Sequence, residues 1–326
     1  MRTAFVVFAL MGLVSSAHSA VDIETALSKV RTSCGGISEE LNTMKTLAGI
    51  GTAVSATGTL TGGAATVTGI VKAQKDAIAM TLTLYAEKWQ ELKNKHTTPS
   101  DKIAVLTYRQ KKDFSNWMAN LQPSNTQSVT DWRPDLQEYR QGTDAGTTGH
   151  ILGDIRTGTL AATTATNIAG AAVGGVNMKK ARGSLSEQVS ECLASVKELS
   201  AAYGQARISR TASEEDLGRI ETIVRVCDEW STVDLSKIDN RATGAFASSI
   251  VGAATGAAGT ITSALANTDE NHLSGTEREK NLNKASNILA GGATVASGAA
   301  TIFNATQISV IKRASTVADA CEGALK

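Results

Sequence analysis

Aromatic residues, prolines and unbalanced charge are all scarce in this chain of 326 residues. Aromatics make up 4% of the residues, prolines number 3, and 32 Lys and Arg stand against 31 Asp and Glu. A nearly neutral chain lacks the basic excess that nucleic acid attracts, so we expect no nucleic-acid partner. The low proline content and the 19% of charged residues also exclude collagen-like and charge-rich disordered classes.

Motifs of catalytic and cofactor sites are missing as well. The sequence contains no P-loop, no H-E-x-x-H and no G-x-S-x-G. Gly49-Ile-Gly51 begins like a dinucleotide-binding fingerprint, but Val54 stands where that motif requires glycine. The histidines after residue 20, which are His96, His150 and His272, have no neighbour at metal-ligand spacing. We therefore expect no enzyme, no catalytic residue, no cofactor and no bound metal.

The first 20 residues, Met1–Ala20, have the pattern of a secretory signal peptide. Arg2 precedes an apolar run from Ala4 to Val14, and small residues follow up to Ala20. An apolar run of 11 residues is too short to cross a bilayer core of about 30 Å. We expect export, to the periplasm or as a secreted or cell-surface protein, with an uncleaved anchor as the alternative.

Four cysteines, Cys34, Cys192, Cys227 and Cys321, follow this segment. An even number of cysteines in an exported chain predicts two disulfides, because thiols outside the cytosol are oxidised. No two of them form a C-x-x-C, which disfavours a redox motif or a zinc site. Four buried free thiols are the alternative.

Four long stretches carry no charged residue: Thr46–Val71, Thr157–Met178, Ala242–Thr268 and Ala285–Ile311. Each is dominated by Gly, Ala, Ser and Thr. Small residues recur there at steps of three and four, which predicts a glycine-zipper seam along one face of a helix. Strands are the alternative, because Thr and Val favour them. The predicted seam residues are Ala48, Gly51, Ser55, Gly58, Gly62, Ala65 and Gly69; Gly158, Ala162, Ala165, Ala169 and Ala172; Ala245, Ser249, Gly252, Gly256, Gly259, Ser263 and Ala266; and Ser286, Ala290, Ala293, Ser297 and Ala300.

The order cysteine, stretch, stretch, cysteine occurs twice and indicates an internal pseudo-repeat. We predict two antiparallel hairpin units, residues 21–203 and 213–326, in an elongated all-α bundle of close-packed Gly/Ala-rich helices. Hairpins of this kind gather the cysteines at one end, which favours Cys34–Cys192 with Cys227–Cys321. Cys34–Cys321 with Cys192–Cys227 obeys the same parity and stays open.

Residues 73–150 form a predicted helical insertion between the halves of the first unit, residues 21–72 and 151–203. All three prolines and most aromatic residues of the chain lie in it. The spacing of Ile78, Leu82, Tyr85 and Trp89 predicts that the first zipper helix continues, and Gly142–Gly149 is expected to be a flexible return. The aromatics form either a small core or a partner surface. That candidate partner surface comprises Trp89, Trp117, Trp132, Arg133 and Tyr139.

These patterns favour an exported structural or protein-interaction component of the cell envelope, whose partner is another protein or a second copy. The alternative is a membrane-embedded glycine-zipper protein, oligomeric or pore-forming, because uncharged stretches of 22–27 residues can span a bilayer. Against that alternative, the third stretch has few large apolar residues beside many Ser and Thr. Lys or Arg also flanks both ends of three stretches, so no positive-inside bias emerges.

Overall fold

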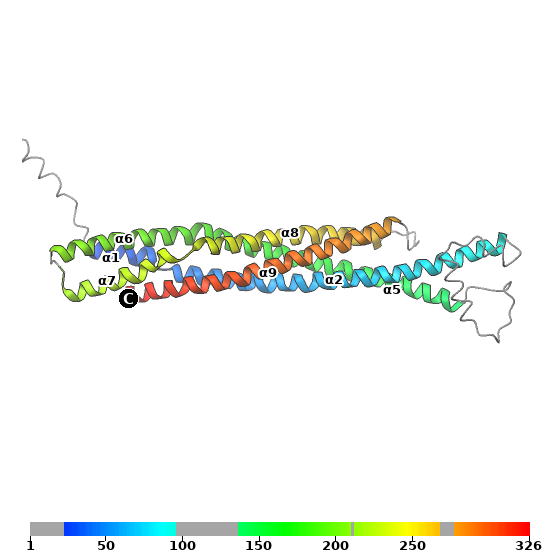
Figure 1. The fold of residues 1–326 in the computed structure, drawn as a ribbon, viewed down its shortest axis with the longest axis horizontal. Helices are drawn as coiled ribbons and strands as arrows, with labels where there is room; N and C mark the ends of the chain where they lie inside the picture. The colour runs from blue at the N-terminus through cyan, green and yellow to red at the C-terminus, as the bar shows by residue number, and fades with distance from the viewer. Residues whose placement is uncertain (1–22, 96–135, 210–211, 268–276) are drawn as a thin grey trace, which may run out of the picture. The chain divides into compact units, whose positions relative to one another are not determined.

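The computed structural model describes residues 23–95, 136–209, 212–267 and 277–326 (Figure 1), and side chains within residues 23–77, 148–209, 212–267 and 278–326. Almost all of these residues are helical and none of them lies in a strand. The predicted all-α bundle is therefore confirmed, and the strand alternative for the uncharged stretches is wrong within these ranges. The predicted signal peptide lies outside the described residues.

Each uncharged stretch lies in one long helix, apart from the last residue of the third. The four long helices are α2 (Ile37–Lys95), α5 (Leu136–Lys180), α8 (Leu235–Asn267) and α9 (Glu277–Leu325). The shorter helices are α1 (Ile23–Cys34), α6 (Ser186–Ser209) and α7 (Glu214–Asp228), with a π-helical turn η2 (Ala181–Leu185) and a 3₁₀ turn η3 (Glu229–Thr232). The first zipper helix continues past Trp89, as predicted.

The chain forms two compact units, each assembled from several segments. Unit 1 comprises residues 1–55, 169–249 and 299–326, and unit 2 comprises residues 56–168 and 250–298. The long helices contribute a segment to both units, so each unit gathers residues far apart in the sequence.

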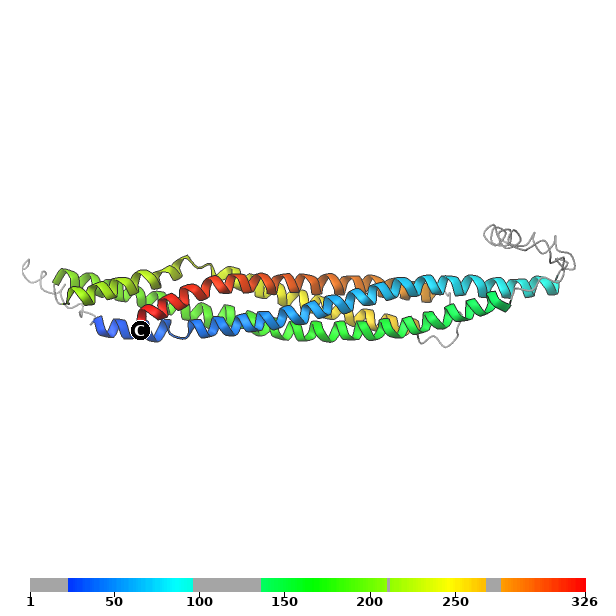
Figure 2. The same cartoon turned by 90° about the horizontal axis from the view of Figure 1, so that it is seen from below.

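Unit 2 packs segments of α2, α5, α8 and α9 side by side (Figure 2). Gly58 of α2 faces Thr166 of α5, and Gly69 faces Arg156, so the two helices are antiparallel. Likewise, Gly256 of α8 faces Thr164 of α5. The contacts of Gly62 with Thr294 and of Gly259 with Leu289 join α9 to α2 and to α8. Two predicted hairpins therefore pack as a four-helix arrangement here.

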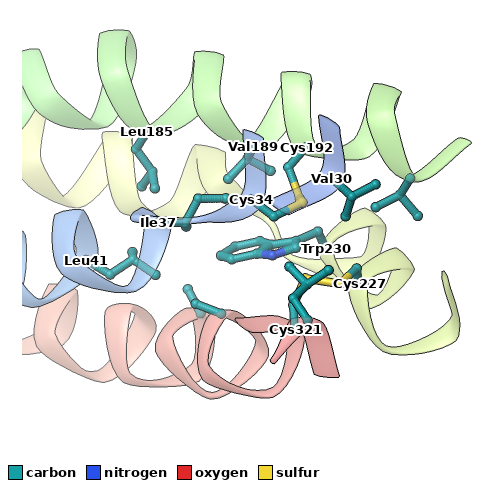
Figure 3. Packing of buried hydrophobic residues seen from close by; sticks show 14 of the residues in the cluster. Val30, Cys34, Ile37, Leu41, Leu185, Val189, Cys192, Cys227, Trp230 and Cys321 are labelled. Carbon is teal, nitrogen blue, oxygen red and sulfur yellow. A yellow bond between two sulfur atoms is a disulfide. The ribbon is translucent and has the colours of Figure 1, made fainter. Parts of the chain in front are cut away.

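Unit 1 holds the largest apolar core, formed by α1, α6 and α7 with parts of α2, α8 and α9. Two disulfides cross it, Cys34–Cys192 and Cys227–Cys321, each with a Cα–Cα distance of 4.7 Å. The buried indole of Trp230 lies between them (Figure 3). The connectivity favoured by the sequence is the one in the structure.

Local signals explain two helix boundaries. Gly36 has a φ of 90°, which side chains other than glycine rarely adopt, and it joins α1 to α2. The side chain of Ser213 accepts a hydrogen bond from the backbone N–H of Asp216 and caps α7.

The expectation of a flexible return at Gly142–Gly149 is wrong, because these residues lie inside α5. Gly149 is buried where α5 approaches α2, and a Cβ atom there would meet the carboxylate of Asp76. The glycine permits close helix packing, and no turn is present.

Candidate functional site

The seam of unit 2 includes glycines at which any larger side chain would collide with the next helix. A Cβ atom on Gly62 would lie 2.6 Å from Oγ1 and 3.3 Å from Cα of Thr294. On Gly256 it would lie 2.7 Å from Oγ1 and 3.4 Å from Cα of Thr164. Glycine is therefore required for backbones to approach this closely, which confirms the packing role predicted for these residues.

Three of the four predicted seams are buried along their whole length, those of α2, α8 and α9. The predicted seam of α5 is wrong: Gly158, Ala162, Ala165, Ala169 and Ala172 are all exposed. The buried face of α5 carries larger and more polar residues. It comprises Arg156, Leu160, Thr163, Asn167, Gly170, Gly174 and Asn177.

Polar side chains link the helices in the interior of unit 2. Asn167 of α5 donates to the backbone carbonyl of Thr163 at 3.0 Å and accepts from Ser297 Oγ of α9 at 2.9 Å. Thr163 Oγ1 donates to Thr61 Oγ1 of α2 at 2.8 Å. Ser286 Oγ of α9 donates to the carbonyl oxygen of Gly259 in α8 at 3.0 Å. These bonds satisfy buried polar groups and fix the helices in one register.

Unit 1 has a similar interior amide pair. Asn177 Nδ2 donates to Gln307 Oε1 at 3.0 Å, and both side chains are buried. Oδ1 of Asn177 and Nε2 of Gln307 have no protein hydrogen-bond partner. The pair joins α5 to α9 within the unit.

A buried ionic cluster lies beside the uncharged stretches in unit 2. Lys72, which is 4% exposed, contacts Asp76 at 2.6 Å and Glu279 at 3.5 Å. Arg156 is 0% exposed and donates to the backbone carbonyl of Asn283 at 3.2 Å. Its Nη1 lies 3.4 Å from the side-chain oxygen of Asn283. Two cations and two carboxylates thus share one interior region.

Burial shifts the pKa of two members of this cluster, Asp76 and Arg156. Desolvation raises the pKa of Asp76, and the hydrogen bond and charge of Lys72 oppose the shift without reversing it. Desolvation also lowers the pKa of Arg156 to about 10, against the opposing charge of Asp76. Arg156 therefore stays cationic at neutral pH and needs the nearby carboxylates as counter-charge.

A cavity of about 290 Å³ adjoins the cluster, between α2 and α9. Polar and charged residues form most of its lining, together with two alanines: Asp76, Glu279, Lys280, Asn283, Lys284 and Asn287, with Ala73 and Ala77. The cluster belongs to the helix packing around it, since its charged groups bond to one another and to Asn283.

The outer surface of unit 2 is apolar where its interior is polar. Large aliphatic side chains point outward from all four helices, with Leu60 76% and Val295 73% exposed. The buried set includes Thr163, Asn167 and Ser297. We call the outward set the aliphatic surface; it comprises Leu60, Val67, Ile70, Val71, Ile151, Ile155, Ile168, Ile250, Val251, Ile261, Leu265, Ile288 and Val295.

The side chains of the candidate partner surface lie outside the described set. Trp117, Trp132 and Arg133 lie outside the described residues. Trp89 and Tyr139 lie on the helical backbones of α2 and α5, and their side chains are outside the described set.

Sequence reasoning missed the aliphatic surface. Its signal was the spacing of Leu60, Val67 and Val71 on the face of α2 opposite the seam.

The sulfur atoms of Cys34, Cys192 and Cys321 lie within 4.8 Å of one another and are buried. In the structure all of them are engaged in disulfides, so none is free to ligate a metal.

Comparison of the chain with protein-family models, curated proteins and solved structures found no match.

Proposed function

We propose that this chain is an exported, non-catalytic structural or protein-interaction component of the cell envelope. The observation that carries the proposal is the aliphatic surface of unit 2, where Leu60, Val67 and Val295 point outward. Large apolar side chains are exposed on all four helices of the unit, and large exposed apolar surfaces usually bind a partner or a membrane.

Two features support export. Met1–Ala20 has the pattern of a signal peptide. Both cysteine pairs are joined in the core of unit 1, and such disulfides persist in oxidising compartments. The proposed location is therefore the periplasm, the cell surface or an envelope membrane.

A role through contact also fits the interior of the bundle. The buried amides and hydroxyls bond across helix pairs, as in Asn167 with Ser297 and Asn177 with Gln307. These groups hold the helices, and the aliphatic surface is left for a partner. The partner would be an apolar component of the envelope or a second copy of the chain.

The export half of the proposal is tested by mass spectrometry of the chain from its native host, with non-reducing peptide mapping. We expect a mature chain that has lost the signal segment, with both disulfides formed. An intact N-terminus together with free thiols at all four cysteines would overturn it.

The contact half is tested with a photo-crosslinking amino acid at Val67, and at the exposed Arg225 of α7 as control. We expect adducts with envelope components from position 67 well above those from position 225. Equal labelling at the two positions would overturn a role for the aliphatic surface.

The aromatic insertion remains a second predicted contact region. Replacing residues 97–135 by a short Gly-Ser link, which leaves α2 and α5 whole, should preserve helicity and both disulfides and abolish capture of a protein partner from envelope extract. Capture of the same partners by the truncated chain would contradict a role for Trp117 and Trp132.

A further inference from the structure

We infer that the aliphatic surface faces the hydrocarbon core of a lipid bilayer, which the uncharged stretches of α2, α5, α8 and α9 cross. The inference rests on the proposed function, because it names the partner of that surface. Three observations carry it: the length of the uncharged stretches, the inverted placement of polar and apolar side chains, and the bonding of the hydroxyl groups.

The lengths match a bilayer in each helix taken by itself. The stretches have 22–27 residues, which span about 33–40 Å at about 1.5 Å per residue. The hydrocarbon core of a bilayer is about 30 Å thick. Charges return next to both ends, at Lys45 and Lys72 of α2 and at Lys284 and Lys312 of α9. By length and hydropathy, α8 and α9 each meet the requirement for a membrane span, whereas the described parts of α2 and α5 are less apolar and would cross as packed partners of these two helices.

The placement of side chains is that of helices packed in lipid. In a membrane, large aliphatic residues face the lipid, while Gly, Ala, Ser and Thr let helix backbones approach and polar groups bond between helices. In α8 the outward residues include Ile250, Val251 and Ile261, and the buried ones include Ser249 and Ser263. Ser and Thr residues of α8 disfavour membrane insertion when they are counted in the sequence alone. In the structure some of them, such as Ser249 and Ser263, are buried and do not lie on the outer surface.

Hydroxyl groups near the surface are satisfied within their own helices. Thr61 Oγ1 donates to the carbonyl of Thr57 at 3.0 Å, and Thr68 Oγ1 to that of Ala64 at 2.7 Å. In α8, Thr262 Oγ1 donates to the carbonyl of Ala258 at 2.9 Å. Hydrocarbon offers no hydrogen-bond partner, so polar hydrogens there must be bonded internally. A water-exposed helix has no such need.

The test compares Ile168→Lys with Ile208→Lys. Ile168 belongs to the aliphatic surface, is 58% exposed and lies within the uncharged stretch of α5, whereas Ile208 is 86% exposed and lies near the end of α6. The substitution is the same, and neither position is buried, so neither lysine should disturb the packing of the helices. A lysine inside a bilayer is strongly unfavourable, whereas one on a wet surface is not.

The full chain and both variants are expressed in the host, and the envelope is extracted with carbonate. We expect the wild-type chain and Ile208→Lys to remain with the membrane, and Ile168→Lys to be recovered there at a level lower by roughly tenfold or more. Leu60→Lys combined with Ile168→Lys should deepen the loss. Circular dichroism and non-reducing mapping check that each variant is helical and has both disulfides.

Purified chain is also mixed with vesicles of phosphatidylethanolamine and phosphatidylglycerol, and flotation reports direct lipid binding. A soluble, exported monomer that ignores the vesicles would overturn the inference. A soluble oligomer that protects position 168 would also overturn it, in favour of a second copy of the chain. Equal extraction of Ile168→Lys and the wild-type chain would overturn it as well. All three results leave export intact, whereas an unprocessed chain with free thiols overturns the proposed function itself.

Discussion

At the scale of single residues, Gly62 and Gly63 of α2 are neighbours with opposite surroundings. A Cβ atom on Gly62 would meet both the hydroxyl and the backbone of Thr294, whereas one on Gly63 would meet nothing within 4 Å. Both glycines carry the same intrinsic penalty in a helix. Packing alone therefore decides what an added methyl group does.

We predict that Gly62→Ala lowers the free energy of unfolding by about 1–3 kcal/mol, because α2 and α9 must move apart. Gly63→Ala should raise it by about 1 kcal/mol through helix propensity. Thermal unfolding followed by circular dichroism measures both. Equal shifts in the same direction would mean that α2 does not pack on α9 through Gly62.

Glu40 near the start of α2 is a second residue whose role can be isolated. It accepts from Lys180 Nζ at 2.8 Å and from Ser184 Oγ at 2.6 Å. Desolvation raises the pKa of Glu40, but the hydrogen bonds from Lys180 and Ser184, with the charge of Lys180, outweigh it and leave the pKa below its ordinary value of 4.5.

A lowered carboxyl pKa means that the unfolded chain binds the proton more readily. Glu40 therefore contributes stability above its ordinary pKa of 4.5, and that stability is lost as pH falls through the lowered pKa of the folded state. We predict that Glu40→Gln destabilises the protein at pH 7 and that its deficit relative to wild type shrinks under acid. The deficit is measured by urea unfolding of both proteins at pH 7 and at pH values below 4.5. Glu39→Gln, at an exposed position, is the control. A pH-independent deficit would contradict the assignment.

At the scale of elements, α5 separates what sequence periodicity can predict from what it cannot. For α2, α8 and α9 the small residues at steps of three and four mark the buried face. In α5 alanines occupy one face and polar residues another, and the structure buries the polar one, with Thr163, Asn167 and Asn177. A composition rich in small residues fills more than one register, so spacing alone could not choose between them.

The register of α5 is tested by paired substitutions. A Cβ atom on Gly174 would lie 3.1 Å from Cα and 3.2 Å from the backbone nitrogen of Phe246, so no side-chain rotation can relieve the contact. We predict that Gly174→Leu costs about 3 kcal/mol. Ala172→Leu, on the exposed face, should change stability by less than about 0.5 kcal/mol. Denaturation midpoints decide, and the reverse order would restore the register predicted from the alanines.

The fold could be predicted from the sequence more fully than the candidate site could. The uncharged lengths, the seam spacing and the order of the cysteines are local signals, and they predicted the helices and the disulfides. The aliphatic surface depends on which helix faces meet, which is a property of four helices together. Counting Ser249 and Ile250 in one window could not reveal that the first is buried and the second exposed.

At the scale of the whole molecule, the two disulfides link distant parts of the chain in unit 1. They join residues separated by 158 and 94 positions. A cross-link restricts the unfolded chain, and in the chain-entropy model loops of this length are stabilised by about 4–5 kcal/mol. Since both disulfides cross one core, we expect the loss of either to destabilise the same set of residues.

We predict that the double variant Cys227→Ala with Cys321→Ala lowers the free energy of unfolding by about 4–5 kcal/mol. The corresponding variant at Cys34 and Cys192 should lose about 0.5 kcal/mol more, because its loop is longer. Denaturant titration under oxidising conditions measures both. An unchanged denaturation midpoint in the fully reduced wild-type protein would contradict a stabilising role for the disulfides.

The composition of unit 1 also bears on the order in which the protein can fold while it is being made. Its core contains both Cys34 of α1 and Cys321 of α9, and Arg31 Nε donates to the carbonyl of Leu325 at 3.1 Å. A ribosome delivers the chain from its N-terminus. Cys34 can therefore meet Cys192 while α9 is still unsynthesised, but Cys227 must wait until Cys321 of α9 has emerged. Synthesis thus imposes an order on the two bridges, and a chain cut short before Cys321 would leave Cys227 without its disulfide partner.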